Sequence, residues 1–190
     1  MLKLALVMGR QGSGKTTRVC RDIQNHLPWW NFVHRCLGRR GSIEVWPNHF
    51  NHMDVGPDGE LIFVTGDHLG KTSVPLGTLR EQPHVLEFPH SGFIPPDAQR
   101  YLNNGRVRTK IFHIELPEAE WRGHGGDVGP ITSPDFFMQN TVARGPRSSF
   151  DYRADVARIR EQIAQSRVPV TTYASTAAMI RPIGRFLLFG

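Results

Sequence analysis

The chain has 190 residues, with 23 Lys and Arg against 17 Asp and Glu, a formal net charge of +6 and a pI near 9.9. This length predicts one domain over residues 1–190, and the basic charge favours a polyanionic partner. No apolar stretch reaches the roughly 18 residues of a membrane-spanning helix, and no signal peptide precedes the first strand, so we expect a cytoplasmic protein with no membrane partner.

The N-terminal region predicts a strand, a phosphate-binding loop and a helix. Residues 2–8 form an apolar run typical of a buried parallel strand. Residues 9–16 read G-R-Q-G-S-G-K-T and match G-x-x-x-x-G-K-[ST] without a mismatch. Val19, Ile23 and Leu27 then recur at helical spacing, and Pro28 is expected to end that helix.

The residue types of this loop suit a nucleoside triphosphate. Glycines let the backbone turn its N–H groups toward phosphate oxygens, and the helix N-terminus adds its dipole. We expect Lys15, with its charge exposed in the empty loop, to contact the β- and γ-phosphates, and Thr16 to bind Mg²⁺. The expected nucleotide-binding residues are Gly9, Arg10, Gln11, Gly12, Ser13, Gly14, Lys15, Thr16 and Thr17.

Further elements follow in chain order. Strands are predicted at 42–46, 83–88, 110–116 and 168–173, and a hairpin with strands at 52–55 and 60–66 joined by a G-P-D-G turn. Residues 97–103 predict a short helix, and Asp151 can cap a second one in which Val156, Ile159 and Ile163 form an apolar stripe. These elements predict an α/β fold, a P-loop NTPase three-layer sandwich with a mainly parallel five-stranded sheet of order 2-3-1-4-5. The hairpin would be an insertion, at about residues 47–82.

The Mg²⁺-organising acid is expected at the end of a strand beside the loop strand. Glu87 is the first candidate and Asp67 the second. Asp67 could instead be the base that takes a proton from an acceptor hydroxyl, a role for which Asp54 competes.

Two segments without regular periodicity have functional interpretations. Residues 66–82 are polar and Gly-rich, which suits binding of an acceptor, although a plain solvent loop would read the same way. Residues 117–149 resemble the lid of nucleoside-monophosphate kinases, whose arginines neutralise the transferring phosphoryl group. The lid candidates are Arg122, Arg144, Arg147 and Arg153.

Cysteine and histidine usage argues against a structural metal or a disulfide. Cys20 and Cys36 fit packing roles in a reducing compartment. The chain has nine histidines, but no Cys or carboxylate set with metal spacing accompanies His49 and His52. The sequence also has no guanine-specifying N-K-x-D, which argues against a GTPase, although it does not settle ATP against GTP.

The layout resembles the bacteriophage 5-hydroxymethyluracil-DNA kinases, which similarly begin with the phosphate-loop motif. The matching elements are Gly66-Asp67-His68, Lys71, Gly77-Thr78-Leu79 and Glu87, although no Asp follows Thr78 as that pattern requires. The resemblance implies a host-cell cytoplasmic phosphotransferase whose acceptor is the hydroxymethyl group of a modified base in DNA. It implies that Asp67, His68, Lys71, Gly77 and Thr78 bind substrate.

We therefore expect an ATP- and Mg²⁺-dependent kinase with a hydroxyl acceptor. The expected catalytic residues are Lys15, Asp67, Glu87, Arg122 and Arg144. The Trp29–Trp30 pair could stack on bases or belong to a packed core. A nucleoside-monophosphate or small-metabolite kinase, and an ATP-binding regulatory module with weak hydrolysis, remain alternatives.

Overall fold

A computed structural model describes residues 1–10, 12–47, 50, 52–67, 70–79, 81–88, 94, 96–121 and 152–190, apart from the side chains of 52, 65–67, 70–72, 154, 155 and 158. The strands are β1 Leu2–Gly9, β2 Glu44–Trp46, β3 His52–Val55, β4 Leu61–Asp67, β5 Gly70–Pro75, β6 Pro83–Glu87, β7 Val107–Ile114 and β8 Val170–Tyr173. The helices are α1 Arg21–Cys36, α2 Pro96–Leu102, α3 Glu118–Trp121, α5 Tyr152–Ala164 and α6 Ala177–Phe189. A π-helical turn, η1 Lys15–Cys20, leads into α1, and a 3₁₀ turn, η2 Leu76–Thr78, follows β5.

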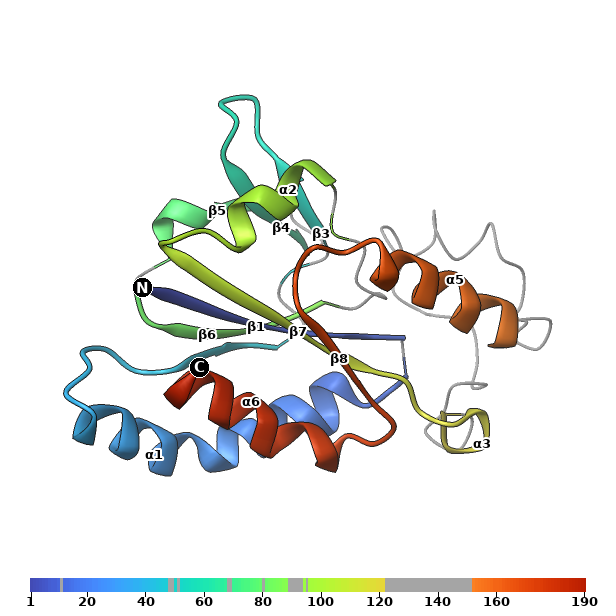
Figure 1. The fold of residues 1–190 in the computed structure, drawn as a ribbon, viewed down its shortest axis with the longest axis horizontal. Helices are drawn as coiled ribbons and strands as arrows, with labels where there is room; N and C mark the ends of the chain where they lie inside the picture. The colour runs from blue at the N-terminus through green and yellow to red at the C-terminus, as the bar shows by residue number, and fades with distance from the viewer. Residues whose placement is uncertain are drawn as a thin grey trace.

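Five parallel strands form the central sheet, in the order β2-β6-β1-β7-β8 (Figure 1). Counted along this sheet alone, the order is 2-3-1-4-5, as the sequence predicts. All eight residues of β1 are buried, which explains its unbroken apolar run. Its carboxyl end is flanked by Glu87 of β6, which pairs with Val7, and by His113 of β7, which pairs with Met8.

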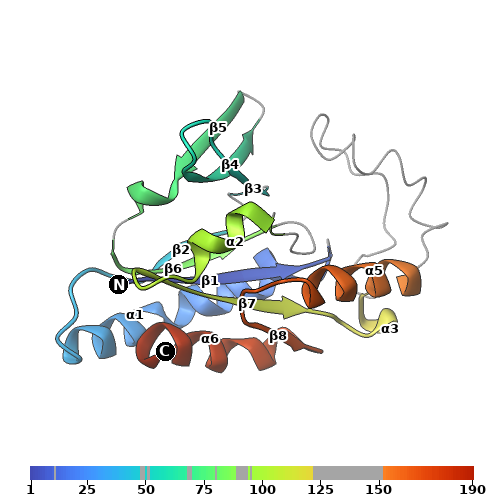
Figure 2. The ribbon, with the colours of Figure 1, turned by 45° about the horizontal axis from the view of Figure 1, so that its top comes forward.

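Layers cover both faces of this sheet. Helices α1 and α6 lie side by side against one face, where Val7, Ile23 and Ile183 share a core (Figure 1). On the other face lie α2 and a three-stranded antiparallel sheet, β3-β4-β5, which contribute Leu102 and Phe63 to a second core (Figure 2). The molecule is therefore an α/β protein whose central sheet is covered by helices on one side and by helix and sheet on the other.

The first helix does not end at Pro28, contrary to the prediction. Helix α1 continues to Cys36 with Pro28 inside it. Proline removes one backbone hydrogen bond from a helix. Beyond it, however, Trp30 and His34 are buried, and their packing holds the second half of the helix in place.

Helix α6 was not predicted from the sequence. This helix contains Pro182 and Gly184, both poor helix formers, and most of its residues are buried. Gly184 is required by packing, because a Cβ there would lie 2.6 Å from the Trp30 ring of α1. Pro182 and Gly184 therefore make α6 difficult to predict from the sequence, and Gly184 also lies at a close contact between α1 and α6.

The predicted hairpin at 52–66 is confirmed, but it belongs to a larger sheet. Residues 70–75, predicted as part of a flexible polar segment, form β5 and pair with β4 in the register Phe63–Val74 and Gly66–Lys71. A strand of an antiparallel sheet with one open face needs few apolar residues, so the composition of residues 70–75 does not identify them as a strand.

The predictions for the remaining helices are mostly confirmed. Helix α2 matches the predicted helix at 97–103, and α5 carries the predicted stripe, with Val156 and Ile159 buried. Asp151, the predicted cap, lies outside the described residues. The segment expected as a lid begins with α3, and its residues 122–149 also lie outside the description.

Candidate phosphate-binding site

The 9–16 loop connects the carboxyl end of β1 to η1. Gly12 and Gly14 have φ values of 78° and 80°, which side-chain-bearing residues rarely adopt. The Ser13 N–H donates to the Arg10 carbonyl at 3.2 Å, and the N–H groups of Arg18 and Val19 donate to the Gly14 carbonyl at 2.9 and 3.1 Å. The loop is therefore a tight turn that runs into a helical N-terminus; its residue Gln11 lies outside the described part.

Lys15 folds back over this loop. Its Nζ donates to the carbonyl oxygens of Gly9 and Arg10, both at 2.8 Å. The side chain is only 5% exposed, so the expectation of an exposed charge is wrong. Burial lowers the pKa of Lys15 to about 8, and the nearby Glu87 and Cys20 partly oppose that shift. The ammonium group therefore lies against the loop backbone. A bound anion would replace the two carbonyl oxygens as its hydrogen-bond acceptors.

Glu87 lies where the sequence predicts an acid, at the end of β6 beside the loop strand. The Thr16 hydroxyl donates to Glu87 Oε1 at 2.6 Å, and the Cys20 thiol lies 3.6 Å from Oε2. Glu87 is 2% exposed. Burial and the neighbouring Glu87 raise the pKa of the Cys20 thiol, so this cysteine stays protonated. A hydroxyl and a carboxylate, the oxygen ligands that Mg²⁺ accepts, thus meet beside Lys15.

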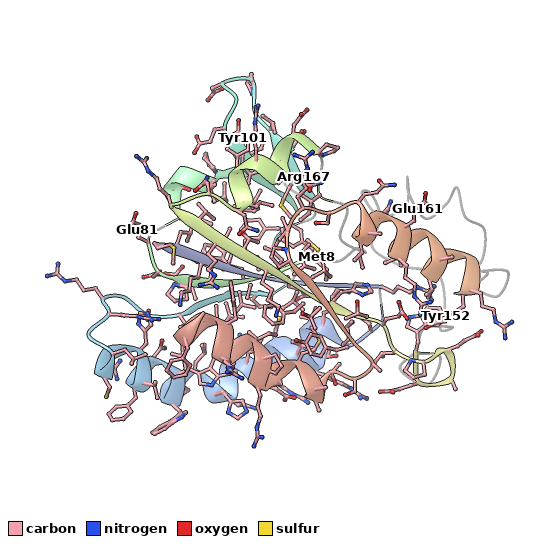
Figure 3. The ribbon with its side chains drawn as sticks, in the orientation of Figure 1. Met8, Glu81, Tyr101, Tyr152, Glu161 and Arg167 are labelled. Atoms are coloured by element: carbon pink, nitrogen blue, oxygen red, sulfur yellow. The ribbon has the colours of Figure 1, made fainter. Side chains whose placement is uncertain are left out.

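Arg10 packs against two aromatic rings that themselves touch, a cluster that the sequence did not indicate. Its guanidinium carbon lies 4.0 Å from the centre of the Trp121 ring and 4.6 Å from that of Tyr152. The Tyr152 hydroxyl in turn donates to the Leu116 carbonyl. Figure 3 shows Tyr152 at the end of the sheet toward which β1 runs. The loop is therefore fastened to α3 and α5 by cation–π contacts.

Two further residues border the loop and were not predicted. His113 is 1% exposed, its Nδ1 lies 3.4 Å from the Thr172 hydroxyl, and its Nε2 has no hydrogen-bond partner among the described residues. Burial, with Lys15 nearby, lowers the pKa of His113 to about 4. Thr176, just before α6, reaches within 3.4 Å of where a Gly14 side chain would begin. Only the parallel pairing of β7 and β8 brings these residues to the loop, so local sequence patterns carry no signal for them.

The structure does not bring the predicted acceptor residues Gly77 and Thr78 to the loop. They belong to η2, and Glu81 just beyond them lies 3.6 Å from the N-terminal amine of Met1. This is the amino end of β1, opposite the loop, and Figure 3 shows Glu81 there. The Gly77 N–H donates to the Glu60 carboxylate at 2.8 Å, and the Thr78 hydroxyl donates to the Pro75 carbonyl within the turn at 2.7 Å.

The remaining predicted residues are only partly described. Asp67 is the last residue of β4 and pairs with Gly70, and Lys71 lies on β5; their side chains, like all of His68, lie outside the described part. Asp54 is exposed on β3, and its carboxylate accepts the N–H of Val55. Arg122, Arg144, Arg147 and His49 lie outside the description, and Arg153 is exposed on α5. The roles assigned to these residues stay predictions.

Other features concern metals, cysteines and membranes. Over the described ranges, no three His, Cys, Asp or Glu side chains gather as metal ligands. Cys20 and Cys36 are both free; Cys20 is buried, as its predicted packing role requires, whereas Cys36 is exposed, so the packing role predicted for it is wrong. No described helix combines the length and apolar character needed to cross a membrane.

The sequence matches no protein-family model and no curated protein.

Proposed function

We propose that this chain is a P-loop kinase that uses ATP and Mg²⁺ to phosphorylate a hydroxyl group. The observation that carries the proposal is the 2.6 Å contact between the Thr16 hydroxyl and Glu87, made directly beside the buried ammonium of Lys15. A hydroxyl from the loop and a carboxylate from the adjacent strand suit Mg²⁺, which takes one or two protein oxygens and fills its other positions with water and phosphate.

The loop backbone and Lys15 would bind the phosphates. Gly12 and Gly14 allow the turn that directs N–H groups outward, and the N-terminus of η1 adds a favourable dipole. Lys15 would exchange its two carbonyl contacts for contacts with the β- and γ-phosphates. Because a buried cation is poorly compensated by carbonyl dipoles, a bound anion would stabilise its charged form.

Phosphoryl transfer forms a bond between the acceptor oxygen and the γ-phosphorus and breaks the bond from that phosphorus to the oxygen of the leaving ADP. The proton of the acceptor hydroxyl passes to a base, for which we propose Asp67. Bound Mg²⁺ would neutralise charge on the phosphates, held by Thr16 and Glu87. Arg122 and Arg144 are proposed to balance charge on the transferring group.

For the acceptor we propose the hydroxymethyl group of 5-hydroxymethyluracil in DNA. The support is the resemblance of Gly66-Asp67-His68, Lys71 and Glu87 to the phage DNA kinases, together with the net charge of +6. The Gly77-Thr78 part of that resemblance lends no support, because those residues lie at the other end of the sheet.

The test is incubation with γ-labelled ATP and Mg²⁺ and two matched acceptors: an oligonucleotide containing 5-hydroxymethyluracil and the free hydroxymethylated mononucleotide. Label in the oligonucleotide supports the proposal in full. Label in the mononucleotide alone would assign a nucleotide kinase instead. ADP formation that no acceptor stimulates would indicate a regulatory ATPase module and overturn the kinase proposal.

A further inference from the structure

The outer surface of the α1–α6 layer combines arginines with exposed aromatic rings. On α1, Trp29 is 63% exposed and Phe32 is 50% exposed; on α6, Phe189 is 62% exposed. Exposed aromatic side chains indicate a binding function when they gather into a contiguous patch.

These rings lie on continuous helical stripes that also carry charge. On α1 the spacing of Arg21, Trp29, Phe32 and Arg35 places these exposed residues on the side opposite the buried Ile23 and Trp30. On α6, Arg181, Arg185 and Phe189 follow at intervals of four and form the exposed stripe. The two helices run in the same direction and pack together, so the two stripes form one surface (Figure 1).

Trp29 and Phe32 form a platform. Their rings stack on each other, with centroids 5.5 Å apart and planes 27° from parallel. The neighbouring Trp30 is different: it is 7% exposed and packs inward, so only one member of the tryptophan pair is available for a ligand. A flat exposed ring pair suits stacking on a planar partner.

The charge of the molecule is concentrated on this layer. Residues 18–40 and 177–190 contain seven arginines and one carboxylate, an excess of six that equals the formal net charge of the whole chain. Among the described residues, Arg35, Arg181 and Arg185 form no ion pair. The remaining residues have a formal net charge of zero, so the excess positive charge that attracts an anion at long range belongs to this layer and its flanking turns.

We propose that this surface binds single-stranded nucleic acid, with arginines on the phosphates and Trp29 and Phe32 stacked on unpaired bases. Interleaved cations and aromatic rings are the usual means of holding a single strand without sequence preference. A symmetric dimer through this face is disfavoured, because it would set an excess of six positive charges against the same excess in the partner. Paired bases in a duplex would leave the ring platform without its ligand.

The surface is separate from the 9–16 loop. Trp29 follows Arg21 by about 12 Å of helix rise, and α1 runs away from the loop along the sheet (Figure 1). Binding here does not depend on the proposed kinase activity and is measured without ATP. In a kinase acting on DNA, it would hold the polymer while the modified base enters a distant site.

The test measures fluorescence anisotropy of a labelled thymidine oligomer of about 15 nucleotides at low salt. We expect the pair of changes Trp29→Ala and Phe32→Ala to weaken binding about tenfold or more, since stacking contributes about 1–3 kcal/mol per base. The pair Arg181→Ala and Arg185→Ala should lower the slope of log affinity against log salt by roughly 1.4, at about 0.7 per phosphate. The matched control, Arg100→Ala with Arg106→Ala, removes the same charge from exposed positions away from α1 and α6 and should leave binding nearly unchanged.

All these side chains are exposed, and equal thermal melting of the variants would establish that they fold. Wild-type affinity for the oligomer in the aromatic variant would overturn the proposal, as would equal loss in the control pair. Two other results would reassign the surface. A dimer in sedimentation that dissociates on loss of Trp29 and Phe32 would make it a self-association face. Binding to anionic vesicles, with none to the oligomer, would make it a membrane-contact face.

Discussion

Lys15 illustrates how a charged side chain can be buried and still form hydrogen bonds. Its ammonium is removed from water yet satisfied by two carbonyls of the loop it serves. Carbonyl dipoles compensate a full charge only in part, which is why burial lowers the pKa of Lys15 to about 8. The motif in the sequence predicts the residue, whereas only the folded loop determines where its charge lies.

Replacing Lys15 by Ala should reduce phosphoryl transfer on the order of 10³-fold, because one charge-assisted contact to the transferring phosphates is lost. The fold should persist, since the change removes a buried charge and leaves the strands intact. Steady-state kinetics on the labelled acceptor, with circular dichroism as the folding control, measures both. Arg106→Ala, which removes an exposed cation elsewhere, should keep full activity. Wild-type turnover in the Lys15 variant would contradict the kinase proposal.

Glu87→Gln should weaken Mg²⁺-dependent activity far more than ATP binding measured in the presence of a chelator. Glutamine can still accept the hydrogen bond from Thr16, but it lacks the negative charge that attracts the metal. A magnesium titration of activity, compared with metal-free ATP binding, separates the two effects. Should Asp67→Asn prove the more damaging change, the roles of the two carboxylates are reversed.

His113 should make the protein sensitive to acid. Its pKa is about 4 in the folded chain, against 6.5 ordinarily, so the unfolded chain binds the proton more readily. The associated stability is fully present above pH 6.5 and is lost as the pH falls through 4. The wild type should therefore lose on the order of 3 kcal/mol more than His113→Gln over this interval. Urea unfolding at the two pH values tests this; parallel losses in both proteins would show that His113 is not the titrating group.

At the scale of elements, local patterns predicted the strands better than the helices. Each central strand is buried and therefore needs a short run of apolar residues, so its position can be predicted from the sequence. Pro28 and Pro182 are ordinarily boundaries, and their places inside α1 and α6 depend on tertiary packing that no local window contains. Strand β5 was not predicted because one face of its sheet needs few apolar residues, so its sequence lacks the apolar run that marks the central strands.

The contact between α1 and α6 gives a prediction at this scale. Gly184→Ala should destabilise the fold by about 1–2 kcal/mol, because the new Cβ meets the Trp30 ring at 2.6 Å and the overlap outweighs the gain in helix propensity. Gly105→Ala is the matched control, since nothing lies within 4 Å of a Cβ there. Thermal and urea unfolding of both variants measures the difference. A stabilised Gly184 variant would mean that α1 and α6 adjust their spacing freely.

Across the whole molecule, one aromatic cluster connects the two sheets. Phe63 of β4 lies 5.3 Å from Phe50 and 6.4 Å from Phe88, which follows β6. Phe50 and Phe63 are both fully buried. The antiparallel sheet is therefore part of the main core, although the sequence presents it as an insertion.

Phe63→Ala should lower the free energy of unfolding by about 3–5 kcal/mol in a single cooperative transition, since it opens a cavity between the two sheets. Phe32→Ala removes the same side chain from an exposed position and should cost less than about 0.5 kcal/mol. Urea unfolding followed by two probes measures both. Two separate transitions, of which only one shifts in the Phe63 variant, would show that the antiparallel sheet folds independently.

The cluster of Arg10, Trp121 and Tyr152 has a consequence for how this chain can be altered. Thirty residues separate Trp121 from Tyr152 in the sequence, yet their ring centroids lie 5.7 Å apart. The chain that connects these two residues therefore begins and ends beside Arg10 of the loop. Because the entropy of closing a chain segment rises only slowly with its length, such a stretch can be lengthened, shortened or replaced at little cost to the sheet. The contacts among Arg10, Trp121 and Tyr152 thus let the fold tolerate changes in the length of the chain between α3 and α5, because they hold both ends of that chain in place.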